Sequence, residues 1–144
     1  MTFPRRSIAI GALVLAAVPA LANPFERVRP VTHEPTRKEC GECHMAFQPG
    51  LLPAASWKRI MDNLNDHFGE SAALAPDVAA DIRAYLTGNA AVRGDGGSLR
   101  ITEQPWWVRE HRLRPDAWTR PGVVSKANCE ACHRGAAQGL YDDD

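Results

Sequence analysis

Two short segments of the 144-residue chain carry the residue types best suited to chemistry. Residues 40–44 read Cys-Gly-Glu-Cys-His, and residues 129–133 read Cys-Glu-Ala-Cys-His. Cys-x-x-Cys-His is the pattern to which haem c is covalently attached. Cysteines three residues apart share one face of a helical turn, so both can form thioethers along one porphyrin edge. The histidine that follows, His44 or His133, then lies below the iron as its proximal ligand.

Together the two segments use all four cysteines of the chain, which makes haem attachment the main prediction. We expect two covalently bound haem c groups, one on Cys40 and Cys43 and the other on Cys129 and Cys132. A single Cys-x-x-Cys could also be half of a structural zinc site or a redox dithiol. Those alternatives give the other histidines no role. On the haem interpretation no cysteine remains for a disulfide.

Each iron needs a second, distal ligand if it is to be six-coordinate. The candidates are His33, His67, His111, Met45 and Met61. His67 borders an apolar helical stripe, and His111 lies one turn after Trp107 and Val108 and can share their face, so both are predicted distal ligands. Met45 directly follows a proximal histidine and cannot easily reach the opposite face of that haem. Met61 lies within the apolar stripe, where a thioether usually fills the core, and His33 lies in a proline-rich arm expected to be exposed.

Chain connectivity also predicts which distal histidine serves which haem. His67 follows His44 by 23 residues, and His111 precedes Cys129 by 18. Short connections are the commoner solution, so we expect His67 at the first haem and His111 at the second. Imidazole on both sides lowers the reduction potential relative to a histidine–methionine pair. An iron closed in this way carries electrons and leaves no open position for oxygen or peroxide.

The N-terminus has the pattern of a secretory signal peptide. Arg5 and Arg6 precede the apolar run 8–18, and a small-x-small cleavage site ends at Ala22. Residues 1–22 should therefore be removed, and a periplasmic protein should begin at Asn23. The run is shorter than the ~20 residues that span a bilayer, although an uncleaved anchor is the alternative. Contact with the membrane surface should be only transient.

Composition bounds the remaining possibilities. The whole chain has 17 basic and 17 acidic residues, and cleavage removes Arg5 and Arg6 without any acid. Charges of both signs are mixed along the chain, so a nucleic acid is not the expected partner. A mature chain this short has a thin core, so two apolar porphyrins should supply much of its stability.

The elements around the first haem motif should be helical. After an extended arm at 23–35, a capping box of Thr36 and Glu39 should start a helix that carries the motif on its first turns. Ser56 should cap a second helix that ends at Gly69 and includes the predicted distal histidine.

The remaining elements should also be helical. A third helix is expected at 76–88, followed by the glycine-rich segment 93–98. Thr102 should cap a short helix with apolar residues at 106–108. Ser125 should start the helix that bears the second haem motif. 

No sustained alternation of apolar and polar residues predicts a strand. We therefore expect an all-α fold in which two short helical haem-binding halves, 23–92 and 99–144, meet at a hinge formed by residues 93–98. The extra histidine follows its motif in one half and precedes it in the other, so a recent tandem repeat is not expected.

Longer motifs in the chain resemble the bacterial dihaem cytochrome c family often called DHC. The segments that carry the resemblance are 43–53, 56–57, 66–70, 101–103, 105–111 and 126–129. The resemblance implies a small periplasmic electron-transfer protein with two bis-histidine haems, able to reduce a small high-spin, oxygen-binding monohaem cytochrome c. A membrane b-type cytochrome is the implied donor. The histidines that match the family pattern are His44, His67, His111 and His133.

The function expected from the sequence is thus electron transfer between redox partner proteins by a monomeric, non-enzymatic dihaem cytochrome c. A small dihaem peroxidase or reductase with one open iron is the alternative. Chain length and the supply of histidines argue against that enzyme. The visible absorption spectrum separates low-spin haem, high-spin haem and a zinc or dithiol module without haem.

Overall fold

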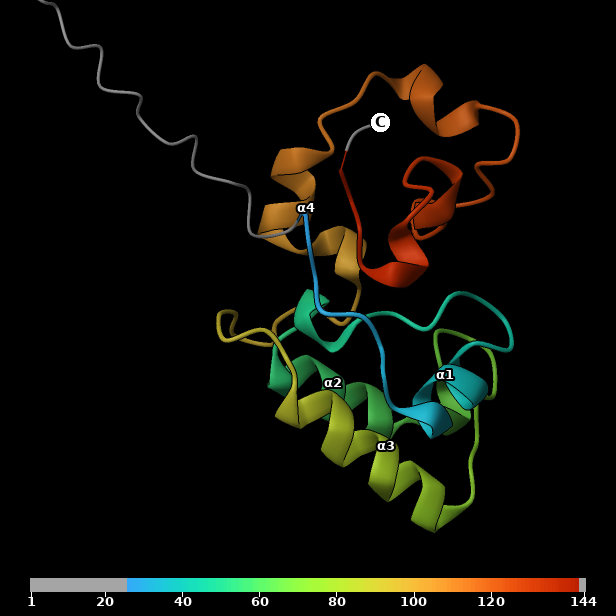
Figure 1. Cartoon of the computed structure of the whole chain (residues 1–144), viewed down its shortest axis with the longest axis vertical. Helices are drawn as coiled ribbons and strands as arrows, with labels where there is room; N and C mark the ends of the chain where they lie inside the picture. The colour runs from blue at the N-terminus through green and yellow to red at the C-terminus, as the bar shows by residue number, and fades with distance from the viewer. Residues whose placement is uncertain (1–25, 143–144) are drawn as a thin grey trace, which may run out of the picture.

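The computed structural model describes residues 26–142 (Figure 1), so the predicted signal peptide, its cleavage site and residues 143–144 lie outside it. In chain order the elements are α1 (Glu34–Cys40), η1 (Pro49–Leu51), α2 (Ala54–Asp62), η2 (Leu64–Asp66), α3 (Pro76–Gly88), η3 (Ile101–Glu103), α4 (Pro105–Glu110), η4 (Pro115–Thr119), η5 (Cys129–Ala131) and η6 (Ala136–Gln138), where η marks a 3-10 helix. Residues 26–142 form isolated β-bridges but no strand. The predicted all-α fold is confirmed. In the same range no helix is long and apolar enough to cross a membrane.

The core lies where α2 packs along α3 (Figure 1). Its buried apolar side chains are Leu52, Trp57, Ile60, Met61, Ile82 and Leu86. The predicted third helix is confirmed at both ends, with proline in its first turn, where no intrahelical N–H is needed. Met61 belongs to this core, which confirms its interpretation as a filler of apolar space.

The first helix differs from its prediction. It begins at Glu34 with Pro35 in its first turn, and its N-cap is His33 with no side-chain capping bond. The predicted capping box at Thr36 and Glu39 is therefore wrong. Proline is preorganised for the first helical turn, and it moves the start of the helix toward the N-terminus. Because α1 ends at Cys40, the rest of the first haem motif lies in the turn after the helix.

The second helix is also displaced. It starts after Pro53 and ends at Asp62, so Ser56 lies inside its first turn rather than capping it. The Ser56 hydroxyl is buried and donates to the carbonyl of Ser98 at 2.7 Å. The predicted continuation to Gly69 is wrong, because η2 and a tight turn follow instead.

The chain beyond the core is mostly 3-10 turns rather than α-helix. Thr102 lies within η3 and does not cap a helix, because Gln104 precedes α4 as its N-cap. The predicted helix starting at Ser125 is wrong as well. There the chain forms a bend and turn, and the second motif begins in η5.

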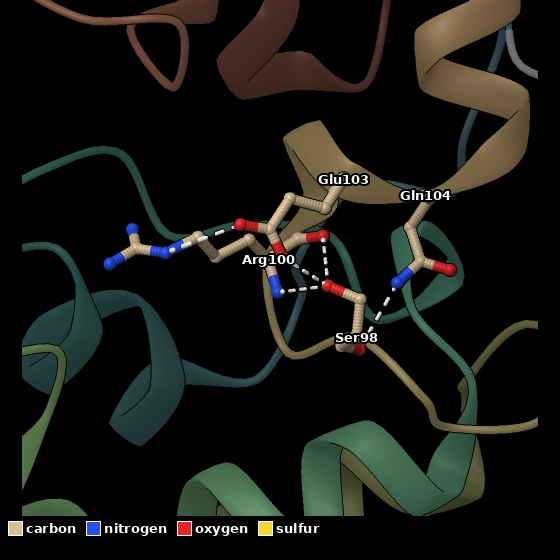
Figure 2. A network of polar contacts seen from close by, with 4 residues as sticks. All are labelled: Ser98, Arg100, Glu103 and Gln104. Carbon is tan, nitrogen blue, oxygen red and sulfur yellow. Dashed lines mark hydrogen bonds and ion pairs between the residues drawn. The ribbon is translucent and has the colours of Figure 1, made fainter.

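The glycine-rich segment 93–98 packs against α2. Gly96 is buried, and a Cβ atom added to it would lie 2.6 Å from the Cβ of Ala55. Figure 2 shows the polar network that follows, in which Ser98 donates to Glu103 at 2.6 Å and its carbonyl accepts from Gln104 at 3.1 Å. The division of the chain into two halves at this segment stays a prediction.

The two ends of the described chain lie side by side. The N–H of Val28 donates to the carbonyl of Gly139, and the N–H of Tyr141 donates to the carbonyl of Glu26, both at 2.8 Å. Gly139 has a φ of 78°, and a Cβ there would lie 1.9 Å from the Val28 carbonyl oxygen, so this pairing requires glycine. The extended N-terminal arm thus fastens the segment that follows the second haem motif.

Candidate haem sites

The N-terminal site comprises Cys40, Cys43, His44 and His67. Cys40 ends α1, and Cys43 and His44 are exposed in the segment that follows it. His67 comes from the far end of the α2–η2 segment. Even so, the rings of His44 and His67 face each other with centroids 6.2 Å apart and planes inclined by 28°. Two histidines separated by 23 residues are thereby brought together.

A tight turn holds His67 in this position. Its N–H donates to the carbonyl of Glu70 at 2.6 Å, and the N–H of Gly69 donates to the carboxylate of Asp66 at 3.0 Å. Both Phe68 and Gly69 have positive φ, at 58° and 103°. Burial, the neighbouring His44 and Arg100 lower the pKa of His67, in that order of effect. A lowered pKa favours the neutral imidazole, which is the form that binds a metal.

The C-terminal site comprises Cys129, Cys132, His111 and His133. His111 is the C-cap of α4, and its ring stacks on that of Trp107 with centroids 4.1 Å apart. The rings of His111 and His133 have centroids 6.0 Å apart, with planes inclined by 80°. The expected sharing of a face between His111 and Trp107 is confirmed.

All four residues of the C-terminal site line an apolar cavity of about 240 Å³. Its walls include three tryptophans, two leucines, an isoleucine and a tyrosine: Trp106, Trp107, Trp118, Leu51, Leu113, Ile101 and Tyr141. Large aromatic surfaces beside two cysteines and two histidines suit a flat apolar group that has a metal at its centre.

Both histidine pairs have the spacing that a bridging metal requires. Since a metal–imidazole bond is about 2 Å long and a ring nitrogen lies about 1 Å from its centroid, one ion between two imidazoles needs about 6 Å. The Nδ1 of His44 lies 2.8 Å from the carbonyl of Met45, and that of His111 lies 3.0 Å from the carbonyl of Trp107. Such bonds orient the ring and leave Nε2 for a metal.

His133 differs from these two histidines. Its buried Nδ1 has no hydrogen-bond partner among residues 26–142. A buried polar atom without a partner is costly, by about 1–3 kcal/mol, and normally has a specific reason. His133 is predicted to be the proximal ligand because it directly follows Cys132 in the second haem motif, and its Nδ1 lacks the carbonyl contact that orients His44 and His111.

Neither Cys40 nor Cys129 resembles the reactive thiol of a redox dithiol. Burial raises the pKa of Cys40 and, to about 11, that of Cys129, whereas reactive dithiols have lowered values. All four cysteines are free thiols in the structure. Within residues 26–142 no three histidine, cysteine or acidic side chains converge as ligands of a metal ion, so a structural zinc site of that kind has no support there.

The ring of His33 contacts three protein side chains, those of Thr36, Asp81 and Tyr85. His33 is half-buried rather than exposed, because its ring stacks on Tyr85 with centroids 4.7 Å apart. Its Nδ1 lies 2.9 Å from the hydroxyl of Thr36, and its Nε2 lies 3.2 Å from the carboxylate of Asp81. The expectation of an exposed His33 is wrong, and both of its ring nitrogens contact protein groups.

Two residues near the C-terminal site had no signal in the sequence. Gln48 and Tyr141 are 93 positions apart, yet the Tyr141 hydroxyl donates to Gln48 at 2.6 Å. Gln48 lies within segment 43–53, which carries the family resemblance, but neither its residue type nor its spacing predicts a buried bond over such a distance.

Comparison with known proteins gives consistent results. A family model described as "DHC: Dihaem cytochrome c" matches residues 36–141. The solved structure of DHC purified from Rhodobacter sphaeroides is 44% identical with a TM-score of 0.71, covering 77% of this chain and 98% of that one. A second diheme cytochrome c structure from Rhodobacter sphaeroides is 40% identical with the same TM-score of 0.71, covering 78% and 99%. A diheme cytochrome from Shewanella baltica is 40% identical with a TM-score of 0.68, covering 76% and 86%. No curated protein matches the chain.

Proposed function

This chain belongs to the dihaem cytochrome c family, with two covalently bound haem c groups, and from that premise we propose that it is a periplasmic carrier with two six-coordinate irons. Haem c supplies an iron that takes up and releases one electron. The protein supplies the attachment, the axial ligands and the environment that sets each potential. Electron transfer is the activity that the family implies.

The observation that carries the proposal is the pairing of four histidines. His44 lies near His67, and His111 lies near His133, with ring centroids about as far apart as two imidazoles that bind one iron need to be. Each pair stands beside its own two cysteines. We assign these four residues as the axial ligands, with the pairing in that order. Ligation of both faces by protein leaves no open coordination position, which favours electron transfer over oxygen or peroxide chemistry.

Electron paramagnetic resonance of three variants tests the ligand set. His67→Ala should convert one haem to a high-spin iron that binds carbon monoxide when reduced, and His111→Ala should convert the other. His33→Ala is the matched control and should leave both signals low-spin, because its ring contacts only protein groups. A high-spin signal in the unchanged protein would instead support the dihaem enzyme with one open iron.

The pairing of ligand to haem needs a further step. Each histidine variant is combined with alanine at Cys40 and Cys43, so that only the C-terminal haem is attached. That haem should stay low-spin with His67→Ala and become high-spin with His111→Ala. The opposite result would show crossed ligation.

The signal-peptide pattern supports a periplasmic location, and the family resemblance implies two redox partners. We propose a membrane-linked b-type cytochrome as donor and a small high-spin, oxygen-binding monohaem cytochrome c as acceptor. Intact mass spectrometry of the exported protein should show a chain that begins at Asn23 with two haems retained after denaturation. Stopped-flow mixing of the reduced protein with such an acceptor should show its reduction, at a rate above that with a low-spin monohaem cytochrome. Equal rates would remove the acceptor assignment.

A further inference from the structure

One buried polar side chain joins the surroundings of the two haem sites. Gln48 follows Phe47, whose ring lies 4.8 Å from that of His44 in the N-terminal site. The Gln48 side chain is completely buried, and its Nε2 donates to the carbonyl of Ala136 at 2.7 Å. Its Oε1 accepts the hydroxyl proton of Tyr141 at 2.6 Å. Both partners belong to the segment that follows the second haem motif.

These partners hold His133 from two sides. The N–H of Ala136 donates to the carbonyl of His133 at 2.9 Å, so the turn that carries the proximal histidine includes the residue to which Gln48 donates. The Tyr141 ring contacts the His133 ring edge-on, with centroids 5.5 Å apart and planes inclined by 69°. Tyr141 and His133 also line the same cavity. Gln48 therefore fixes the backbone that bears the ligand and the aromatic ring that packs against it.

His133 depends on this support because the protein gives its ring little other orientation. The Nδ1 atoms of His44 and His111 each lie beside a backbone carbonyl, whereas the buried Nδ1 of His133 has no partner among residues 26–142. A ligand ring that lacks such a bond is oriented mainly by packing. The packing partner is Tyr141. The Tyr141 hydroxyl donates to Gln48 at 2.6 Å, so this bond holds the ring that packs against His133.

We propose that Gln48 is a positioning residue of the C-terminal haem site, which through Tyr141 and the Ala136 turn sets the orientation of His133 and with it the potential of that haem. The inference rests on the proposed function, because it needs His133 as an axial ligand. It adds that the C-terminal haem site is incomplete without a residue from the N-terminal half.

The experiment uses the holoprotein with three variants. Gln48→Leu removes both bonds and keeps the side chain close in size, and Tyr141→Phe removes only the hydroxyl. Ser56→Ala is the matched control, because Ser56 is equally buried and also donates across the fold, to the carbonyl of Ser98, but does not reach the C-terminal site. Spectroelectrochemistry gives the two midpoint potentials. The low-spin signal lost in His111→Ala identifies the C-terminal haem.

Gln48→Leu and Tyr141→Phe should shift the potential and the g-values of the C-terminal haem, the former more than the latter, with those of the N-terminal haem unchanged. Ser56→Ala should lower stability and shift neither haem. If Gln48→Leu does not fold, Tyr141→Phe alone decides. The positioning role would be overturned if both haems were low-spin and neither variant changed their potentials or g-values, or if both haems shifted equally. The proposed function would still stand in either case. Failure to find two low-spin haems in the unchanged protein would overturn the proposed function itself.

Discussion

The two haem sites are built in different ways by the same short chain. The N-terminal site stands beside a core of apolar side chains between α2 and α3, and its His44 is exposed. The C-terminal site has one short α-helix, α4, and otherwise 3-10 turns around an aromatic cavity. Much of the apolar surface in the C-terminal part therefore faces the cavity rather than another element. The difference implies that the N-terminal part has a core of its own, whereas the C-terminal part depends on its haem.

Removing each haem attachment in turn is the strongest test of this difference. Alanine at both Cys129 and Cys132 should unfold the C-terminal part, because the cavity loses the group that covers its aromatic walls. Alanine at both Cys40 and Cys43 should leave most of α2 and α3 formed. Far-ultraviolet circular dichroism and limited proteolysis measure the two outcomes. Equal losses of structure in the two variants would refute the asymmetry.

A core substitution should have the next largest effect, and only in the N-terminal part. Ile82 is completely buried between the helices, so Ile82→Ala should lower the free energy of unfolding by about 2–5 kcal/mol. Val124 is 85% exposed and does not line the cavity, so Val124→Ala should cost less than about 1 kcal/mol. Chemical denaturation of the holoprotein compares the two variants. An equal cost at Val124 would contradict the expectation that this part of the chain has no core of its own.

The aromatic wall should respond more weakly but at one haem only. Trp107 is buried and stacks on His111, so Trp107→Phe should reduce stability by about 0.5–1.5 kcal/mol and alter the low-spin signal of the C-terminal haem. Phe47→Leu is the counterpart beside His44 and should alter the other signal. Electron paramagnetic resonance of both variants checks this assignment. It would be contradicted if both variants altered the signal of the same haem.

The smallest effect is expected at the histidine outside both sites. His33→Ala removes contacts with Thr36 and Asp81 and should cost about 1 kcal/mol in the free energy of unfolding. Both haems should remain low-spin. Thermal unfolding monitored at the Soret band gives the stability change, and Asp81→Asn, which keeps a polar partner, should cost less. A change in haem spin state would return His33 to the set of ligand candidates.

Helix boundaries show where sequence patterns were insufficient. The start and end of α3 followed from proline, glycine and a regular apolar stripe, and the structure has the same limits. The apolar stripe of α2 also predicted which face of the helix meets the core. The Ser56 hydroxyl, however, donates to the carbonyl of Ser98 instead of capping the helix. A serine is a good cap only where no tertiary partner competes, and that partner lies 42 positions away. The helix at the first haem motif ends at Cys40, and the helix expected at the second motif is only the 3-10 turn Cys129–Ala131.

By itself the sequence determined the chemistry of this protein. Cys-x-x-Cys-His can be recognised locally because attachment needs two thiols and an imidazole within one or two turns. The two occurrences of this motif give the number of haems. Only the tertiary structure decided how His44 meets His67, how His111 meets His133, and how Gln48 reaches Tyr141. These contacts join residues that are distant in the chain. Their geometry depends on how helices and turns pack, and no local pattern of residue types encodes that packing.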